Sequence, residues 1–409
     1  MTSRTVAVGH LDADCFYVSA ERARDDFLRD KPVGVLGNQG ACVIAKSYEM
    51  KAAGVHTGEP IWEARAKCPN GIYVKRDFHW YEVLSQCMRE VLKELSPQVE
   101  YYSVDEFFFL AVPLPGRTFQ ETAEVIRDQI SERVRVPVTV GIARTRTLAK
   151  LISDTAKPFG ALAVLDKEEE HAYLKDRPVT EITGIAGRRQ RHLLPWGIRT
   201  CLDLAQADRR LVRKLLMANG EALWWELNGD PVHPIHAQRP LHKTLSRGGS
   251  LGESTADPVI LYAWLVRHLE RLIEELEYHA VLPGRLTVWV SYKNGEAKVG
   301  QTTLAVPTDR FDTLLDALRP CLRQAWVPRA QATRMNLVAE HLIPRRQAPL
   351  GLFDPPDARS EALARVKREV NDRHGRFALR SAATLPLVEI YRDGANGYDI
   401  CDLRGKICF

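Results

Sequence analysis

The sequence predicts a multidomain α/β protein, in which an N-terminal α/β domain is followed by a helical region and by a second domain of strands and helices. The first part alternates strand-like runs with amphipathic stretches, such as residues 122–134 followed by residues 136–142, and this order is typical of an α/β layer. Residues 166–232 show helical periodicity instead. The chain has 409 residues, enough for roughly two to four domains with apolar cores.

The N-terminal domain begins with an apolar run that ends in Asp12 and is followed by helix-like sequence. A small insert punctuated by Gly and Pro occupies residues 28–75. A second apolar run, residues 102–109, contains the adjacent Asp105 and Glu106. In the helical region, residues 182–187 read Ile-Thr-Gly-Ile-Ala-Gly, and their glycines favour a tight turn between helices.

Residues 230–242 carry three prolines and no clean periodicity, which indicates an extended linker and a domain boundary. Beyond it, helical and strand patterns follow one another. They predict helices over residues 261–279, 311–326 and 360–373, and strands over residues 285–292 and 333–342.

Composition argues against a membrane-spanning or disulfide-stabilised protein. No apolar run approaches transmembrane length, and the first residues lead into a strand without a signal-peptide pattern. The eight cysteines include no Cys-x-x-Cys pair, so we expect a cytoplasmic protein with reduced thiols and no structural zinc. The net charge is +5, with basic clusters at residues 188–191, 209–214 and 345–346. These clusters could contact nucleic-acid phosphates or form solvated helix faces.

Asp12, Asp105 and Glu106 are the residues most informative about chemistry, because charges inside strand-like runs are costly unless a cation meets them. An acidic pair can also form a tight turn, protect a sheet edge or make a salt bridge. Neighbours in a regular strand point to opposite faces, so Asp105 and Glu106 share a site only at a strand end, turn or bulge. Carboxylates without a nearby His or Cys favour Mg²⁺ or Mn²⁺, and a pair of such ions suits phosphoryl transfer.

Several motifs in chain order closely resemble those of the Y-family translesion DNA polymerases of the polymerase IV and polymerase V type. The two catalytic motifs of that family resemble residues 12–17, Asp-Ala-Asp-Cys-Phe-Tyr, and residues 103–106, Ser-Val-Asp-Glu. Residues 45–55, 140–143 and 156–160 continue the likeness.

The resemblance implies a right-hand polymerase with an α/β palm, small fingers, a helical thumb with a helix-hairpin-helix, and a separate β/α little-finger domain. The implied domains are a palm (1–27 and 76–165), fingers (28–75), a thumb (166–232), a linker (233–242), a little finger (243–344), a clamp-binding peptide (345–354) and a C-terminal tail of unknown role (355–409).

The resemblance also implies a role for each candidate site residue. The catalytic residues would be Asp12, Asp105 and Glu106, which with the backbone carbonyl of Ala13 would hold two Mg²⁺ ions, Mn²⁺ being possible. The residues implied to contact the incoming nucleotide are Phe16, Tyr17, Tyr48, Lys51 and Lys157, with Tyr17 as the steric gate against ribose. Cys42 and Ile44 would roof the nascent base pair. Asp14 matches a frequently acidic position and receives no metal.

Two further sets of residues would bind macromolecules. Those implied to bind a DNA phosphate are Gly184, Ala186, Gly187 and Arg188. Those resembling a peptide that docks on the sliding clamp are Gln347, Leu350, Leu352 and Phe353. Each feature has a structural alternative: an ordinary helix-helix turn for the hairpin, a packed tail strand for the peptide, and core or surface positions for lone aromatic and cationic residues.

The implied function is template-directed, error-prone DNA synthesis past lesions, by two-metal nucleotidyl transfer from dNTP to the primer 3′-hydroxyl. The implied partners are primer-template DNA, dNTPs and the sliding clamp (β-clamp); the protein would be a monomer, free of membrane and associated with the nucleoid during repair. One alternative is a catalytically silent, clamp-tethered paralogue that acts as a scaffold, but such proteins typically lose acidic ligands. Another is an α/β metal nuclease, which leaves the hairpin, gate and clamp peptide unexplained.

Overall fold

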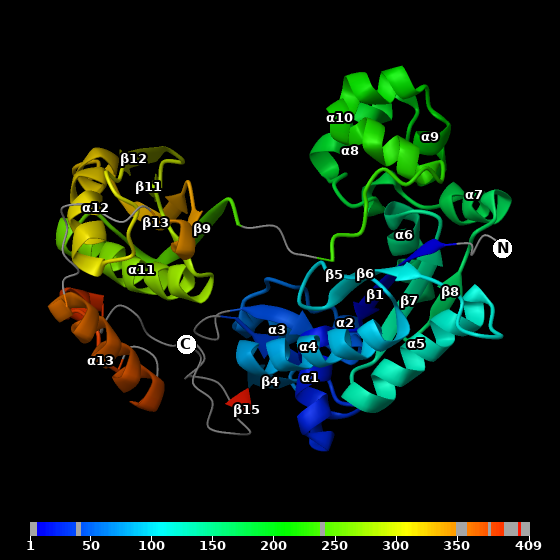
Figure 1. The fold of residues 1–409 in the computed structure, drawn as a ribbon, viewed down its shortest axis with the longest axis horizontal. Coiled ribbons are helices and arrows are strands. Elements are labelled where there is room, and N and C mark those ends of the chain that lie inside the picture. The colour runs from blue at the N-terminus through cyan, green and yellow to red at the C-terminus, as the bar shows by residue number, and fades with distance from the viewer. Residues whose placement is uncertain are drawn as a thin grey trace. The chain divides into compact units, whose positions relative to one another are not determined.

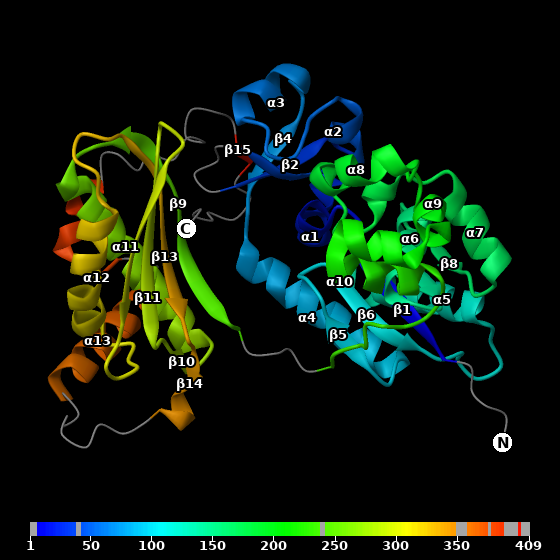
Figure 2. The same ribbon diagram turned by 90° about the horizontal axis from the view of Figure 1, so that it is seen from above.

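The computed structural model describes residues 6–37, 42–237, 242–348, 358–374, 378–387 and 400–401. The chain divides into two compact units (Figures 1 and 2), one formed by residues 1–239 with 394–408 and the other by residues 240–393 with Phe409. Each unit has strands and helices around its own apolar core. The predicted multidomain α/β fold is therefore confirmed.

A five-stranded sheet with the strand order β5-β6-β1-β7-β8 is the centre of the first unit. Its strands are β1 (Ala7–Ala13), β5 (Val99–Tyr101), β6 (Glu106–Ala111), β7 (Val138–Ala143) and β8 (Ala161–Ala163). Strand β1 lies between β6 and β7, antiparallel to both, and every one of its residues is buried. The middle strand of the sheet is thus the one that carries Asp12.

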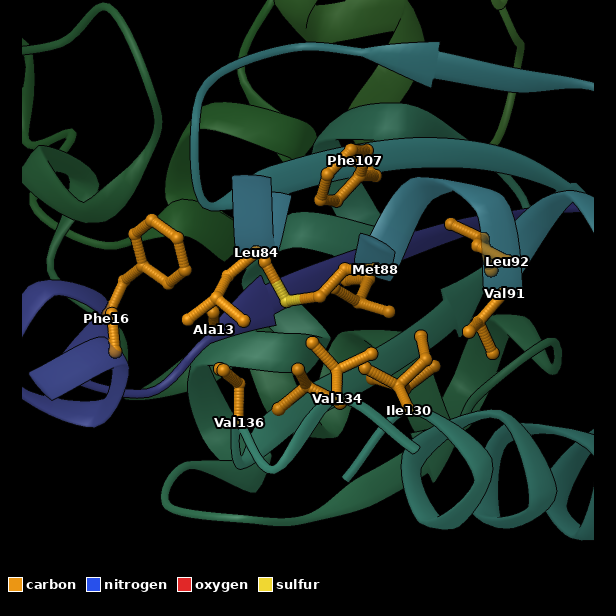
Figure 3. Close-up of a cluster of buried hydrophobic side chains, with 14 of the residues drawn as sticks. Ala13, Phe16, Leu84, Met88, Val91, Leu92, Phe107, Ile130, Val134 and Val136 are labelled. Carbon is orange, nitrogen blue, oxygen red and sulfur yellow. The ribbon is translucent and has the colours of Figure 1, made fainter. Parts of the chain in front are cut away.

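One face of this sheet packs on apolar side chains of two long helices, α4 (Phe78–Leu95) and α5 (Phe119–Val134). Figure 3 shows Phe107 of the sheet with Met88 of α4 and Ile130 of α5 in this core. Helix α1 (Phe16–Arg24) follows β1 directly and contributes Phe16 to the same cluster. Since side chains alternate along a strand, the residues next to these core positions face the other side of the sheet.

The opposite face of the sheet is covered by α6 (Arg146–Ala156), which packs on β7 and β1. Its backbone approaches Gly141 of β7 so closely that a Cβ there would lie 2.4 Å from both the Ala149 oxygen and the Ser153 nitrogen. Backbone atoms of a helix cannot shift separately to admit that carbon. The glycine therefore fixes how near α6 comes to the sheet.

The insert predicted between residues 28 and 75 forms a small sheet of order β15-β4-β2-β3 with a separate apolar cluster. The elements of this region are η1 (Asp26–Leu28), β2 (Val33–Leu36), β3 (Val43–Lys46), α2 (Tyr48–Ala52), α3 (Ile61–Lys67) and β4 (Ile72–Lys75). The fourth strand of the sheet, β15 (Ile400–Cys401), comes from the C-terminal part of the chain and pairs parallel with β4.

The helical region consists of short elements followed by a longer helical segment, which is interrupted by a kink at Met217. They are α7 (Lys167–Lys175), η3 (Val179–Glu181), α8 (Gly187–Leu193), η4 (Leu194–Trp196), α9 (Cys201–Gln206) and α10 (Arg209–Leu227). The chain that leaves α10 is held against the unit, because buried Glu226 accepts hydrogen bonds from the nitrogens of Val232 (2.9 Å) and His233 (3.0 Å). The start of the predicted linker is thus anchored.

The second unit contains a four-stranded antiparallel sheet of order β12-β11-β13-β9. Its elements are β9 (Thr244–Thr255), α11 (Pro258–Tyr278), β10 (Val281–Leu282), β11 (Arg285–Tyr292), β12 (Ala297–Thr303), α12 (Phe311–Ala325), β13 (Ala332–Glu340), β14 (Ile343–Pro344) and η5 (Arg345–Gln347). Helices α11 and α12 pack on this sheet. Trp289 of β11 is 46% exposed between buried Val288 and Val290, so its side chain points away from the helices.

Two described parts of the segment to which the sequence assigned no role, residues 358–374 and 378–387, pack on the second unit. Helix α13 (Ala358–His374) is joined to α11 by ion pairs of Lys367 with Glu270 and of Arg368 with Glu277, and η6 (Ala382–Leu387) packs on α11. Buried Glu270 of α11 joins both, binding the Lys367 ammonium (2.5 Å) and accepting a hydrogen bond from the Ser381 nitrogen (2.9 Å). Within the described ranges, no helix has the length and apolarity that crossing a bilayer requires.

Candidate active site

The register of β1 and β6 brings two of the three predicted acids together. Asp12 lies directly opposite Glu106, and directly paired residues project from the same face of a sheet. His10 lies two residues before Asp12 and shares that face. One potential ligand atom from each of His10, Asp12 and Glu106 lies within 4.8 Å of the others. The expectation that no histidine lies near the carboxylates is therefore wrong.

Asp105 lies in a bend that immediately precedes β6. Its carboxylate accepts a hydrogen bond from the Ser103 hydroxyl (2.6 Å), and its carbonyl accepts one from the Ala13 nitrogen (2.9 Å). The acidic pair thus occupies a strand end, as the alternation argument required. Asp105 is outside the three-residue cluster but near Tyr17, whose pKa is raised by burial and, to a lesser degree, by the Asp105 charge.

Two lysines compensate the clustered carboxylates. The Lys157 ammonium lies 2.6 Å from Asp12 Oδ2, and the Lys150 ammonium binds Glu106. Burial raises the pKa of Asp12 to about 7; the Lys157 charge opposes this shift and the Glu106 charge adds to it. The acids therefore lie in a largely desolvated site where each carboxylate has a cation as its partner.

Lys150 and Ser153 are site residues that the sequence reasoning missed. Residues 150, 153 and 157 follow helical spacing, so the first two project from one face of α6 and Lys157 follows at its end. Ser153 Oγ lies 2.7 Å from His10 Nδ1 and donates to the Lys150 carbonyl at 2.8 Å. The spacing back from Lys157 was the signal that could have identified them.

His10 is fully buried beside these cations. Burial lowers the pKa of His10 well below its ordinary value, and the charges of Lys150, Lys157 and Arg146 lower it further. Its Nε2 lies 4.0 Å from Glu106 Oε1, too far for a hydrogen bond. The ring is therefore neutral and fixed through Nδ1.

The predicted nucleotide-contacting aromatics differ in exposure. Phe16 is 4% exposed and belongs to the core, the structural alternative left open for it. Tyr17 is half-buried and stacks on Tyr81, with ring centroids 4.6 Å apart. Tyr48, which is 39% exposed, and Lys51, which is also exposed, lie one turn apart on α2.

The predicted roof residues lie in or beside β3. Cys42 forms an isolated bridge with Pro60, and Ile44 packs at the edge of the core of the first unit. Both are half-buried. Both side chains lie beside Gly37 of the insert, and their role at a base pair stays a prediction.

The predicted hairpin is anchored by Ile182 and Ile185, which are buried, while Gly184, Ala186 and Gly187 are exposed. Gly184 has a φ of 95°, a conformation that glycine adopts at little cost. Exposed Arg188 follows at the start of α8. This is the geometry that lets a backbone approach a phosphate, although it also fits an ordinary helix-helix turn.

The other basic clusters are partly occupied by local ion pairs. Arg209 and Arg213 both bind Glu221, and Arg345 binds Asp309. Gln347 ends η5 and is exposed. The remaining predicted clamp residues, Leu350, Leu352 and Phe353, lie outside the described residues.

Comparison with known proteins gives matches over most of the chain. A sequence model of the impB/mucB/samB family matches residues 11–154, and a model of the C-terminal domain of that family matches residues 242–352. The chain is 32% identical over 367 residues to DNA polymerase IV 2 of Mesorhizobium japonicum, covering 86% of each chain. It is 29% identical over 405 residues to DNA polymerase IV 1 of Bacillus subtilis, covering 97% of each.

A solved structure shares the fold. The Y-family DNA polymerase chimera Dbh-Dpo4(243-245)-Dbh superposes with a TM-score of 0.69 at 22% identity, covering 83% of this chain and 99% of that one. The chain therefore has the fold of a Y-family DNA polymerase, with the acidic cluster on its central sheet. The chain belongs to the impB/mucB/samB family, the bacterial Y-family DNA-directed DNA polymerases.

The donor set fits a divalent cation. Asp12 and Glu106 offer hard carboxylate oxygens, which suit Mg²⁺ and Mn²⁺, and the His10 nitrogen beside them is compatible with Mn²⁺. Y-family polymerases generally use divalent metals. Lys150 and Lys157 compete with such an ion for the same oxygens.

We expect Mn²⁺ to stabilise the metal-stripped protein against heat, and Glu106→Gln to remove most of that effect. At about 100 times its Kd, a ligand that binds only the native state adds about 2.7 kcal/mol. The measurement is the melting temperature with EDTA and with Mn²⁺. Glu94→Gln is the matched control, because Glu94 pairs with Arg133 in an exposed position. An equal Mn²⁺ shift in Glu106→Gln and wild type would contradict this ligand assignment.

Proposed function

We propose that this protein is a template-directed, error-prone DNA polymerase that performs translesion synthesis by two-metal nucleotidyl transfer from dNTP to the primer 3′-hydroxyl. The observation that carries the proposal is the pairing of Asp12 with Glu106 across β1 and β6, on the α6 face of the sheet. Several proteins to which this chain is similar are named DNA polymerase IV.

Asp12, Asp105, Glu106 and the Ala13 carbonyl would hold the metal ions, with Mg²⁺ the first candidate and Mn²⁺ the second. The bound ions would activate the primer hydroxyl and neutralise charge on the triphosphate. The bend at residues 103–105 places Asp105 outside the regular alternation of β6, which supports a site shared with Glu106.

The side chains that would bind the triphosphate are Tyr48, Lys51 and Lys157. A hydroxyl and two ammonium groups suit a polyanion whose negative charge moves toward the leaving group. Lys51 stands where the family commonly has Arg, and an ammonium is a point charge without the bidentate geometry of a guanidinium. We therefore propose a weaker hold on the triphosphate at that position.

The remaining parts of the chain would handle the DNA and the clamp. Residues 184–188 would bind a DNA phosphate, Cys42 and Ile44 would roof the base pair, and the sheet of residues 243–344 would contact the DNA backbone. The boundaries given above for palm, fingers, thumb and little finger remain part of this proposal. We place the protein in the cytoplasm as a monomer that acts at the nucleoid.

Replacing Asp105 or Glu106 by Ala should abolish nucleotide addition while leaving DNA binding largely intact, because these side chains would contact metal rather than duplex. The expected loss is on the order of 10³-fold or more in rate, and Asp12→Ala should behave alike. The assay is extension of a primed template with Mg²⁺ and dNTPs, beside a DNA-binding titration. Extension by both variants at saturating Mg²⁺ would refute the assignment. If wild type neither extends nor degrades the primer, the result favours the catalytically silent paralogue. If wild type degrades the primer, the result favours a nuclease.

Tyr17→Ala should increase incorporation of ribonucleotides relative to deoxyribonucleotides. The ring stacks on Tyr81, which holds it rigidly enough to exclude a 2′-hydroxyl by steric clash. Tyr17→Phe keeps the ring and is the matched control, for which selectivity should stay near that of wild type. The measurement is single-nucleotide competition between the two sugars. Unchanged selectivity in Tyr17→Ala would place the gate elsewhere.

Replacing Leu352 and Phe353 by Ala should abolish stimulation by the loaded sliding clamp and leave distributive synthesis near normal. A short peptide in a groove gets most of its affinity from a few buried apolar anchors, and tethering raises the effective concentration of the enzyme at the primer. The control pair is Leu363→Ala with Val366→Ala on α13, since both side chains are exposed and apolar. Equal stimulation of wild type and the Leu352/Phe353 double variant would show that the segment is not the tether.

A further inference from the structure

Asp14 receives hydrogen bonds from three segments that are far apart in the sequence. The Tyr48 hydroxyl lies 3.3 Å from Oδ1, and the Phe159 nitrogen donates to Oδ2 at 2.8 Å. The Thr139 hydroxyl lies 3.0 Å from Oδ2 and 3.2 Å from Oδ1. Asp14 is only 3% exposed, so its carboxylate depends on these donors to replace water.

The contact to Phe159 shapes the segment that carries Lys157. Phe159 has a φ of 52°, a conformation that is costly for a residue with a side chain. The hydrogen bond from its nitrogen to Asp14 opposes that cost. Lys157 lies two residues earlier and reaches Asp12. Two neighbouring aspartates, Asp12 and Asp14, therefore hold the two ends of one short segment.

The contact to Tyr48 fixes a group on the insert. Burial raises the pKa of Tyr48, and the Asp14 charge raises it further, so the hydroxyl keeps its proton and acts as a donor. A tyrosine hydroxyl has a single proton to donate. In the nucleotide-free structure that proton is directed to Asp14. When a nucleotide is bound it would turn to a phosphate oxygen, and Thr139 and Phe159 would remain as the donors to Asp14. Asp14 thus holds Tyr48 near the place where a triphosphate would need it.

We propose that Asp14 is a positioning residue for the triphosphate of the incoming nucleotide, because it orients both the Tyr48 hydroxyl and the Lys157–Phe159 segment without binding metal or substrate. The inference rests on the proposed function for the roles of Tyr48 and Lys157. The further step is that the affinity for dNTP depends on the Asp14 carboxylate, which holds Tyr48 and the segment of Lys157 but does not itself contact the nucleotide.

Asp14→Asn is the test substitution. An asparagine keeps one acceptor oxygen, but its NH₂ group is a donor. That donor would face one of the N–H or O–H groups whose hydrogen bonds Asp14 now accepts. We expect the KM for dNTP to rise about tenfold and kcat to stay within about threefold of wild type, since the metal ligands are unchanged. Asp154→Asn is the matched control: it removes a carboxylate 3.3 Å from the Lys157 ammonium and leaves the Asp14 contacts in place. An unchanged KM in Asp14→Asn, or an equal rise in Asp154→Asn, would overturn the proposal.

A double-variant cycle separates positioning from general damage. If Asp14 acts through Tyr48, Asp14→Asn combined with Tyr48→Phe should raise the KM by less than the product of the two single effects. Full additivity would remove Tyr48 from the proposal. Should Asp14→Asn fail to fold, Thr139→Val keeps the carboxylate but removes one of its donors. Its KM should rise in the same direction, and an unchanged value would count against the proposal.

Amide hydrogen exchange tests the positioning without any catalytic activity. The Phe159 amide should be protected in nucleotide-free wild type and in Asp154→Asn, and should exchange faster in Asp14→Asn. Equal exchange in the three proteins overturns the inference. If the three proteins show these expected exchange rates but wild type adds no nucleotide, the proposed function is refuted and the anchoring role of Asp14 is still supported.

Discussion

Two carboxylates facing each other across β1 and β6 are the constraint on which the rest of the site depends. Burial disfavours the ionised form of Asp12 and raises its pKa to about 7, and repulsion by the nearby Glu106 charge adds to this shift. Two ammonium groups compensate these negative charges, that of Lys150 on α6 and that of Lys157 directly after this helix. That helix can lie so near only because Gly141 has no side chain. One glycine on β7, one helix face and two acids therefore act as a single structural unit.

The same strand connects this unit to the apolar core. Along β1, Leu11 and Ala13 belong to the core on the α4 and α5 side, whereas His10 and Asp12 face α6. A shift of the pairing by one residue would exchange the two sets and bury the acids among apolar side chains. The hydrophobic effect that fixes the register of β1 thereby also fixes which acids meet. Asp12 and Glu106 are therefore aligned by the same strand register that buries the apolar side chains of β1.

The sequence could predict those features that depend on local patterns. The strand and helix around Asp12, the strand end at Asp105 and the turn at Gly184 all follow from periodicity, alternation or glycine content. His10, Lys150 and Ser153 were missed as neighbours of the acids. Alternation along β1 and helical spacing back from Lys157 mark the faces on which these residues lie. Their contact with the acids, however, depends on which helix covers the sheet and how closely. Strands β9 and β12 were missed because their residues are polar, Gly-rich and largely exposed. The packing of residues 358–374 and 378–387 was missed because it depends on Glu270, a buried acid of α11.

Lys157 shows how the structure and the proposed function fit together. In the structure its ammonium is bound to Asp12, yet the proposed function assigns it to the triphosphate. The formal charges of Asp12 and Glu106 are cancelled by those of the two lysines, and Asp154, 3.3 Å from the Lys157 ammonium, adds one negative charge. A divalent cation bound by the same acids would compete with the lysines and leave the cluster with excess positive charge. A triphosphate is the polyanion that restores the balance, and the released Lys157 is already held at the site by the Asp14 contact to Phe159. Under the proposed function, metal and nucleotide therefore favour each other's binding, and linkage makes that coupling equal in both directions.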